Sequence, residues 1–231
     1  MTVIAVVHHL ERPFLGHARR PLLARGATLR EVDRRRGDAL PALDEIDALV
    51  SFGGEQSVAV AEPDALLCEE LDWMRDAVAA GVPVLGVCLG GQLLARALGG
   101  SVHALARPNL AWKPLEVTPG GSADPIAGAL ESPVGLFWNN DAIVPPPGAV
   151  ELLRAPGDGC AAFRYGSTAW GIQFHPEVTA DVLEHWWERW GADQLARSGV
   201  DEATARAADA RHLGGQAALS AVVFERFAAL S

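Results

Sequence analysis

A glycine-flanked cysteine, Cys88, is the residue of this sequence best placed for covalent chemistry. It follows the apolar run 82–87, and Gly86 and Gly90 stand two positions away on either side. Small neighbours permit a sharp strand-to-helix turn that holds the side chain at a strained, exposed tip. A helix that begins directly afterwards points free N–H groups at the sulfur, favours the thiolate, and lets the Leu89 N–H donate to an oxyanion. We therefore predict a thiol nucleophile at Cys88.

A thiol nucleophile needs a base that can also protonate a leaving group. Of the seven histidines, His175 fits best, because it follows the apolar run 168–174 and precedes Pro176 in a rigid turn. Glu177 lies two residues later and can accept a hydrogen bond from the far imidazole nitrogen, which would fix the tautomer. Taken alone, the string could equally be a solvated turn. Combined with Cys88, it predicts a Cys-His-Glu triad.

A double-glycine turn, Gly53-Gly54, ends another apolar run. Carboxyl ends of parallel strands meet at one edge of a sheet, where ligands bind. Two glycines let backbone N–H groups approach a substrate and supply the second half of an oxyanion hole; an ordinary strand–helix loop is the alternative. A phosphate-binding loop is excluded, because neither of its glycine patterns occurs here.

The other cysteines and histidines carry weaker signals. Cys68 lies in a helical segment with no glycines near it, and Cys160 opens a strand-like run, so we expect both to be packing residues. His8 and His9 end the first apolar run and are candidates to line a pocket. The tryptophans at 186, 187 and 190 could offer a stacking surface, but we expect them to pack their helix on the sheet or to form a protein interface.

Alternating apolar runs and helical periodicities indicate an α/β domain with a mostly parallel sheet. Strands are expected at 3–7, 27–32, 47–52 and 82–87, and helices at 14–25, 63–80 and 92–98. Further, partly antiparallel strands are expected at 112–117, 134–138, 151–154, 161–165 and 169–174, followed by helices at 179–190, 202–213 and 216–230. We therefore predict one domain over residues 1–190. A helical extension, 191–231, would pack on that domain or on a partner.

Composition narrows the functional class. The 231 residues include 19 basic and 29 acidic ones, a net charge of −10, which argues against nucleic acid or an anionic membrane as the main partner. Three cysteines are too few for a disulfide framework, and we find neither a signal peptide nor a membrane span, so we expect a cytoplasmic protein. No cluster has metal-ligand spacing. We expect no metal and no other cofactor, and the oligomeric state stays open.

Taken together, these motifs resemble the class I, triad-type glutamine amidotransferase family. The Gly-Gly turn at 53–54, the elbow GVCLGGQ at 86–92 and GIQFHPE at 171–177 occur in the family's order and approximate spacing, across about residues 3–190. The resemblance is closest to standalone members similar to the glutaminase domain of GMP synthase. It implies a flavodoxin-like fold and hydrolysis of a γ-glutamyl amide through a cysteine thioester.

Carried over by position, the resemblance implies that Cys88 is the nucleophile, His175 the acid and base, and Glu177 its orienter. The N–H groups of Gly54 and Leu89 would form the oxyanion hole. Two further elements would contact substrate: Gln92, at the position that holds the amino-acid end of glutamine, and a loop containing Trp138, Asn139, Asn140 and Asp141.

Three departures from the family pattern bear on the substrate. Gly91 stands where many members have His or Met, Asn139-Asn140 where a His-Gly pair is frequent, and Glu55 where Pro is usual. Glu55 and Asn139 could therefore select a compound other than free glutamine.

Several functions remain open from the sequence. The chain could be a freestanding hydrolase of γ-glutamyl compounds, the glutaminase subunit of a separate synthetase partner, or a non-catalytic binding relative. A peptidase or isomerase of the neighbouring heat-shock/protease-like family is disfavoured by Gln92 and the His-Pro-Glu string.

Overall fold

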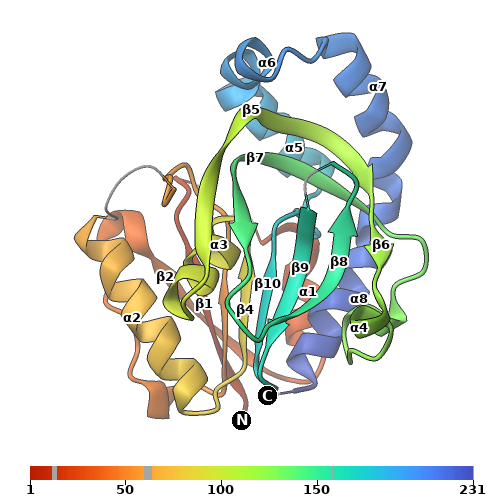
Figure 1. The fold of residues 1–231 in the computed structure, drawn as a ribbon. Helices are drawn as coiled ribbons and strands as arrows, with labels where there is room; N and C mark the ends of the chain where they lie inside the picture. Colours follow the sequence, from red (N-terminus) through yellow and green to blue (C-terminus); the bar gives the residue numbers. More distant parts are fainter. Residues whose placement is uncertain (12–14, 60–63, 158, 231) are drawn as a thin grey trace.

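A computed structural model describes residues 1–11, 15–59, 64–157 and 159–230, and in this part of the chain a central sheet is covered by helices on both faces (Figure 1). The sheet runs in the order β2 (Thr28–Asp33), β1 (Val3–His8), β3 (Ala48–Ser51), β4 (Val84–Val87), β10 (Ala169–Ile172), β9 (Gly159–Tyr165), β8 (Val150–Ala155) and β6 (Glu116–Val117). From β2 to β10 neighbouring strands are parallel, and from β10 to β6 they are antiparallel. The predicted fold class is confirmed.

The apolar strands form because both of their faces are buried. Ile4 and Val6 point into one core, whereas Ala5 and Val7 point into the other, as period-two alternation requires. The first core is closed by α1 (Arg19–Leu23) and α8 (Gln216–Ala228), and the second by α2 (Ala65–Ala79) and α3 (Leu89–Ala97). Packing on both faces of the sheet thus fixes the positions of the carboxyl ends of the strands.

A separate antiparallel ribbon, β5 (Ser101–Pro114) with β7 (Val134–Val144), curves over the central sheet (Figure 1). The predicted strands 112–117 and 134–138 were too short. The pairing register shifts between Ala104 and Asn109, and most of β5 is half-buried or exposed, so hydrophobic alternation does not mark it.

Helices pack against the outer side of this ribbon. They are α5 (Ala180–Trp186), a π-helical turn (Trp187–Gly191), α6 (Ala192–Ser198) and α7 (Glu202–His212). The expected helix 179–190 therefore does not stop at Trp190 but continues through the π turn to Ser198. Further on, Phe224 and Phe227 of α8 lie in the core of the sheet. The division between residues 190 and 191 stays a prediction.

The remaining elements are short. They are α4 (Pro119–Ser122) and 3-10 turns at Gly16–Ala18, Arg34–Arg36, Leu43–Glu45, Ala127–Ala129 and Leu213–Gly215. The expected helix 14–25 is therefore a 3-10 turn followed by the five residues of α1. Its start at Phe14, and Pro63 at the expected start of α2, lie outside the described residues. Asp64 caps α2 by accepting a hydrogen bond from the Leu67 N–H.

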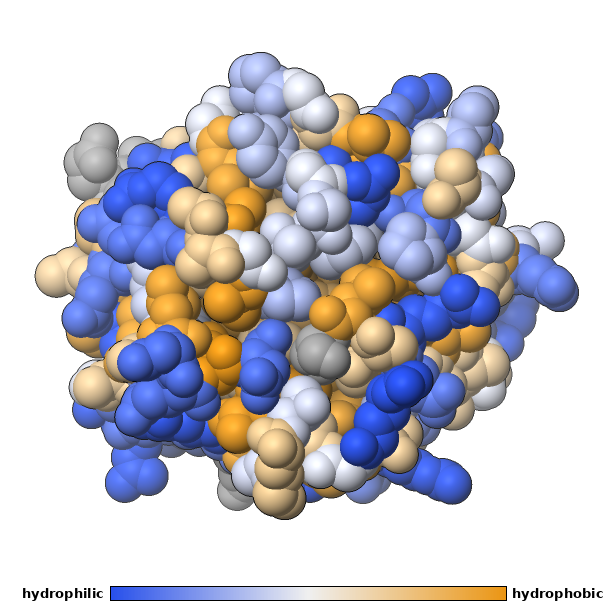
Figure 2. Space-filling view, turned by 90° about the horizontal axis from the view of Figure 1, so that it is seen from below, coloured by the Kyte–Doolittle hydropathy of each residue, from blue (hydrophilic) through white to orange (hydrophobic). Residues whose placement is uncertain are grey.

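Both termini lie at the lower end of the molecule (Figure 1). Seen from that end, hydrophobic residues alternate with charged ones over the surface (Figure 2). Within the described ranges, no helix combines the length and the apolar character needed to cross a membrane.

Candidate active site

Cys88 stands at the junction of β4 and α3 in a strained backbone conformation. Its φ of 53° and ψ of −108° lie in a region that a non-glycine residue rarely adopts. Its N–H donates to the Ile172 carbonyl at 2.7 Å, which ties the turn to β10. The predicted sharp turn between strand and helix is present. Cys88 was expected to be exposed at this turn, but it is only 6% exposed. It lines a cavity together with Gly53 and Trp138.

The glycines after Cys88 allow α3 to pack directly on the sheet. A Cβ on Gly90 would lie 2.1 Å from the Ser51 carbonyl oxygen, and one on Gly91 would lie 2.7 Å from that of Ile172. Both obstacles are backbone atoms, which cannot rotate away. Gly91, which stands where many family members have His or Met, therefore lies at a point where α3 closely approaches β10.

Replacing Gly90 by alanine should destabilise the protein by about 1–3 kcal/mol, the usual cost of overpacking. Intrinsic helix propensity predicts the opposite sign, since alanine is favoured over glycine by about 1 kcal/mol. Urea unfolding followed by tryptophan fluorescence measures the difference. Gly215→Ala is the matched control, because nothing lies within 4 Å of a Cβ there. A Gly90→Ala protein as stable as the wild type would contradict the packing described.

His175 and Glu177 lie directly beside Cys88. The His175 Nδ1 is 2.7 Å from Glu177 Oε1, and the Cys88 sulfur accepts a hydrogen bond from Gln173 Nε2 at 3.8 Å. Burial by itself lowers the pKa of His175, but the charges of Glu177 and Cys88 raise it to about 10. The imidazolium is thereby favoured, and this is the form that can protonate a leaving nitrogen.

The turn after β3 reaches the same point. A Cβ on Gly53 would lie 3.0 Å from His175 Cε1 and 3.6 Å from the Cys88 Cβ. Gly54 and Leu89, the two expected oxyanion donors, both line the cavity. The backbone of two separate loops therefore borders the sulfur.

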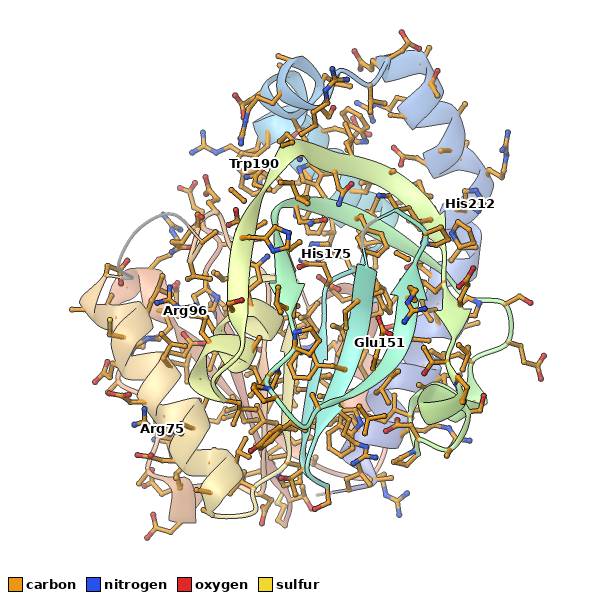
Figure 3. The ribbon with its side chains drawn as sticks, in the orientation of Figure 1. Arg75, Arg96, Glu151, His175, Trp190 and His212 are labelled. Carbon is orange, nitrogen blue, oxygen red and sulfur yellow. The ribbon has the colours of Figure 1, made fainter. Side chains whose placement is uncertain are left out.

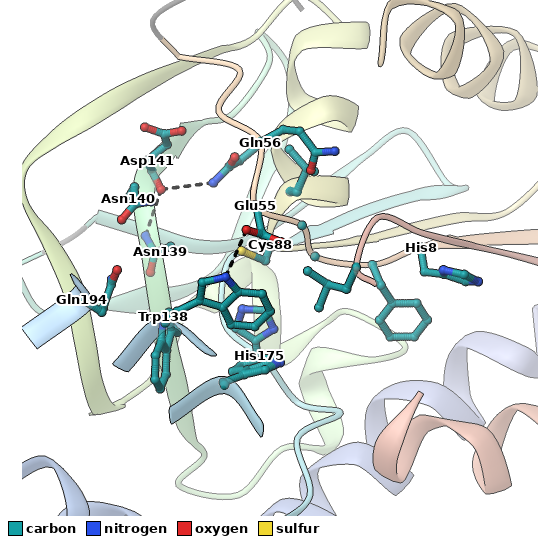
Figure 4. Close-up of a pocket in the computed structure, with 18 of the residues that line it drawn as sticks. His8, Glu55, Gln56, Cys88, Trp138, Asn139, Asn140, Asp141, His175 and Gln194 are labelled. Atoms are coloured by element: carbon teal, nitrogen blue, oxygen red, sulfur yellow. Dashed lines mark hydrogen bonds between the residues drawn. The ribbon is translucent and has the colours of Figure 1, made fainter. Parts of the chain in front are cut away.

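The opposite part of the cavity is polar. Gln92 Nε2 and Asn139 Nδ2 donate to the Asp141 carbonyl at 3.2 and 2.9 Å (Figure 4). The Asp141 carboxylate accepts from Ser57 Oγ at 2.6 Å. The Asn139 Oδ1 is buried without a partner. Residues 138–141 were expected to form a loop but belong to β7, because the strand continues to Val144. The cavity holds about 220 Å³, below the ~300–1,000 Å³ of pockets for drug-sized ligands.

The family model described as glutamine amidotransferase class-I matches residues 27–188, which is most of the chain. The chain belongs to this family. The resemblance that the motifs predicted is thus confirmed.

Curated relatives of this class-I glutamine amidotransferase agree. It is 32% identical to the glutamine amidotransferase-like protein YfeJ of Salmonella typhimurium over 64% of each chain. It is 33% identical to the glutamine-hydrolysing GMP synthase of Aeropyrum pernix over 71% of this chain but only 31% of that one. It is also 32% identical to a glutamine-hydrolysing GMP synthase subunit of Sulfolobus acidocaldarius, over 59% of this chain and 70% of the relative. The chain therefore spans less than two thirds of the first two relatives.

Solved structures share the fold. A glutamine amidotransferase from Methylobacillus flagellatus superposes with a TM-score of 0.85 at 25% identity, covering 98% of this chain and 94% of that one. A second, from Thermotoga maritima, gives a TM-score of 0.84 over 98% of both chains at 24% identity, which shows the fold alone. Both matches extend through the C-terminal helices.

The cavity also contains aromatic residues that the sequence analysis did not assign to the candidate site. Trp186 lies against the His175 ring, with centroids 4.7 Å apart, and Trp190 lines the same cavity. Trp190 and His175 both belong to the half of the molecule crossed by β5 and β7 (Figure 3). Three residues of α6 also line the cavity: Asp193, Gln194 and Arg197. In the sequence, only the spacing of Trp186 and Trp190 pointed to these residues, and we interpreted it as packing of their helix on the sheet or as a protein interface.

Beneath the Gly53-Gly54 turn lies an ion pair that the sequence did not predict. His9 Nε2 is 2.8 Å from Glu70 Oε2, both side chains are fully buried, and Ser51 Oγ donates to the other Glu70 oxygen at 2.7 Å. His9 Nδ1 also lies 3.2 Å from the Phe52 carbonyl. Of the two histidines expected near a pocket, His8 lines the cavity, whereas His9 supports the turn from below.

The other two cysteines lie apart from the cavity lining. Cys160 is half-buried on β9, and burial, with the Glu151 charge, raises the pKa of its thiol to about 12. Cys68 is exposed on α2, so its assignment as a packing residue was wrong: its side of the helix faces solvent.

Proposed function

We propose that the chain hydrolyses a γ-glutamyl amide, glutamine or a related compound, through a thioester on Cys88. The proposal rests on the hydrogen-bonded pair His175–Glu177, which lies beside Cys88 at one cavity. In it, Cys88 is the nucleophile, His175 the acid and base, and Glu177 the group that holds the imidazole in place. Family membership supports a glutamine-hydrolysing role.

The reaction proceeds in two halves. The Cys88 sulfur attacks the γ-carbonyl carbon, and the N–H groups of Gly54 and Leu89 stabilise the oxyanion. Protonated His175 gives its proton to the leaving nitrogen as the C–N bond breaks, which releases ammonia or an amine and leaves a γ-glutamyl thioester. Water then gives a proton to His175 and attacks the thioester, the C–S bond breaks, and glutamate leaves.

The polar part of the cavity suits the amino-acid end of this substrate. Gln92 and Asn139 are held there by the Asp141 carbonyl, and the free Asn139 Oδ1 can accept a hydrogen bond from an ammonium group. Trp138, which packs edge-on against Trp186, forms one side of the cavity.

A second candidate is a glutaminase subunit that delivers ammonia to a separate synthetase. It is favoured by the similarity to the Sulfolobus protein, which is named as one subunit of GMP synthase. In either case we expect a small-molecule γ-glutamyl substrate and a cytoplasmic location, with no metal or other cofactor.

Glutamate and amine release, measured separately on the purified chain, test the proposal. Brisk hydrolysis of glutamine or another γ-glutamyl amide supports the freestanding hydrolase, whereas near-silence that a synthetase relieves supports the partner-dependent glutaminase. A glutamine-analogue electrophile should add once, on Cys88, and excess glutamine should block it. Labelling elsewhere, or none, together with no turnover would remove the proposal.

A further inference from the structure

The position of the leaving nitrogen is set by His175, since a general acid must come within hydrogen-bond reach of the atom it protonates. Around His175 the cavity wall is aromatic. The Trp186 ring is edge-on to the imidazole, and the Trp138 ring is edge-on to Trp186 at 5.8 Å between centroids. Trp190, one helical turn beyond Trp186, also lines the cavity. A substituent on the leaving nitrogen would therefore contact the indole rings. Ammonia, which carries no substituent, would not fill the space between them.

Glu55 closes this aromatic part of the cavity from the other side. Its Oε2 accepts a hydrogen bond from Trp190 Nε1 at 3.0 Å, joining the turn after β3 to the helix after α5 (Figure 4). Because the partner is a neutral indole, the bond does not cancel the carboxylate charge. The other carboxylate oxygen is left for a ligand, and the Trp190 ring, which also meets the His185 ring edge-on at 6.0 Å between centroids, borders the cavity.

The remaining charges of the cavity are offset or distant. The charged or titratable groups in its described lining are His8, Glu55, Cys88, Asp141, His175, Glu177, Asp193 and Arg197. Asp193 pairs with Arg197 at 3.3 Å, and Glu177 pairs with His175 at 2.7 Å. Burial lowers the pKa of His8, so this group is neutral at pH 7.

Two carboxylates of the lining are then without a cation among these residues. Asp141 is bonded to Ser57 in the polar part, near Gln92 and Asn139. Glu55 is the unbalanced charge beside the leaving-group space. A carboxylate next to an aromatic face is a combination that binds an ammonium group, through a charge-assisted hydrogen bond and a cation–π contact.

We propose that the site is selective for γ-glutamyl amides whose amine part carries a second, cationic nitrogen, bound by Glu55 and Trp190. The inference rests on the proposed hydrolase activity and names its substrate class. The γ-glutamyl end occupies the polar part near Asn139, and the amine chain runs past His175 to the Glu55 carboxylate. An amine part that ends in a carboxylate, as in a γ-glutamyl peptide, is repelled there.

Three matched substrates test this inference on the whole chain. They are the γ-glutamyl amides of 1,4-diaminobutane, n-pentylamine and 5-aminopentanoate, which share a chain length and end in a cation, a methyl group and an anion. We expect kcat/KM for the cationic amide to exceed that of the neutral one by at least about 10-fold, with the anionic amide slowest. Added salt should reduce this preference, because it screens the carboxylate.

Substitution then assigns the preference to its residue. Glu55→Gln should bring the cationic-to-neutral ratio within about 3-fold of unity, since the charge is lost. Glu188→Gln removes an equal charge from an exposed position outside the cavity lining and should keep the wild-type ratio. If Glu55→Gln is poorly folded, the salt dependence of the wild-type ratio decides instead.

The possible failures are distinguishable. Equal kcat/KM for the three amides, a salt-independent ratio, or an unchanged ratio in Glu55→Gln would overturn the cationic subsite and leave the hydrolase intact. Hydrolysis of neither glutamine nor any of the amides would overturn the proposed function and this inference with it.

Discussion

Replacing Cys88 by alanine should lower kcat/KM for glutamine or any γ-glutamyl amide by at least about 10⁴-fold, the scale on which covalent hydrolases lose activity without their nucleophile. The Cys88 side chain and the His175 imidazole both lie against Gly53, and the charge of Cys88 helps to raise the pKa of His175, so thiol and base act as one unit. Cys88→Ser should be nearly as inactive, because a hydroxyl ionises far less readily than a thiol and the raised pKa of His175 keeps the imidazole protonated, so it cannot accept the hydroxyl proton. Steady-state glutamate release measures both variants.

The two other cysteines of the chain provide controls for the Cys88 variants. Cys68→Ala changes an exposed cysteine on α2, and Cys160→Ala changes one whose raised thiol pKa leaves it unreactive. Both variants should keep wild-type kcat/KM and still accept a single electrophile adduct. Activity above about 1% of wild type in Cys88→Ala would mean that the reaction does not pass through this sulfur.

The elbow was predictable because its requirements are local in sequence. A nucleophile between β4 and α3 needs glycines at fixed offsets, and Gly86 and Gly90 occur at those offsets. The parallel strands were equally visible, since burial on both faces makes runs such as residues 3–7 continuously apolar. The pairing of Glu177 with His175 followed from a separation of two residues.

The rest of the site depends on contacts between distant parts of the chain. Glu55 and Trp190 are 135 positions apart, and His9 and Glu70 are 61 apart. Such partners show no periodicity that a single sequence reveals. Asn139 was expected in a loop for a related reason: the ribbon that extends β7 pairs with a strand whose alternation is broken by a register shift.

Replacing Glu70 by alanine should destabilise the protein by about 3–5 kcal/mol, the cost of leaving one member of a buried ion pair without its partner. The Glu70 carboxylate is fully buried and hydrogen-bonds both His9 and Ser51. Its removal therefore leaves a buried imidazole and a buried hydroxyl without their partner. Urea unfolding at neutral pH measures the loss. Because the pair supports the Gly53-Gly54 turn, we also expect kcat to fall in the folded variant.

The pH dependence of this loss has a definite sign. Burial by itself lowers the pKa of His9, but the charge and hydrogen bond of Glu70 raise it above its ordinary value of 6.5. The stabilisation is therefore complete below about pH 6.5 and is lost as the pH rises through the folded-state pKa. The difference in unfolding free energy between wild type and Glu70→Ala should therefore shrink as the pH rises from about 6.5 through the folded-state pKa of His9. Asp72→Ala, on the same helix but in an exposed pair with Arg75, should change stability by less than about 1 kcal/mol at either pH. A Glu70→Ala loss as small as this control, or one that grows with pH, would show that His9 and Glu70 are not an ion pair in the folded protein.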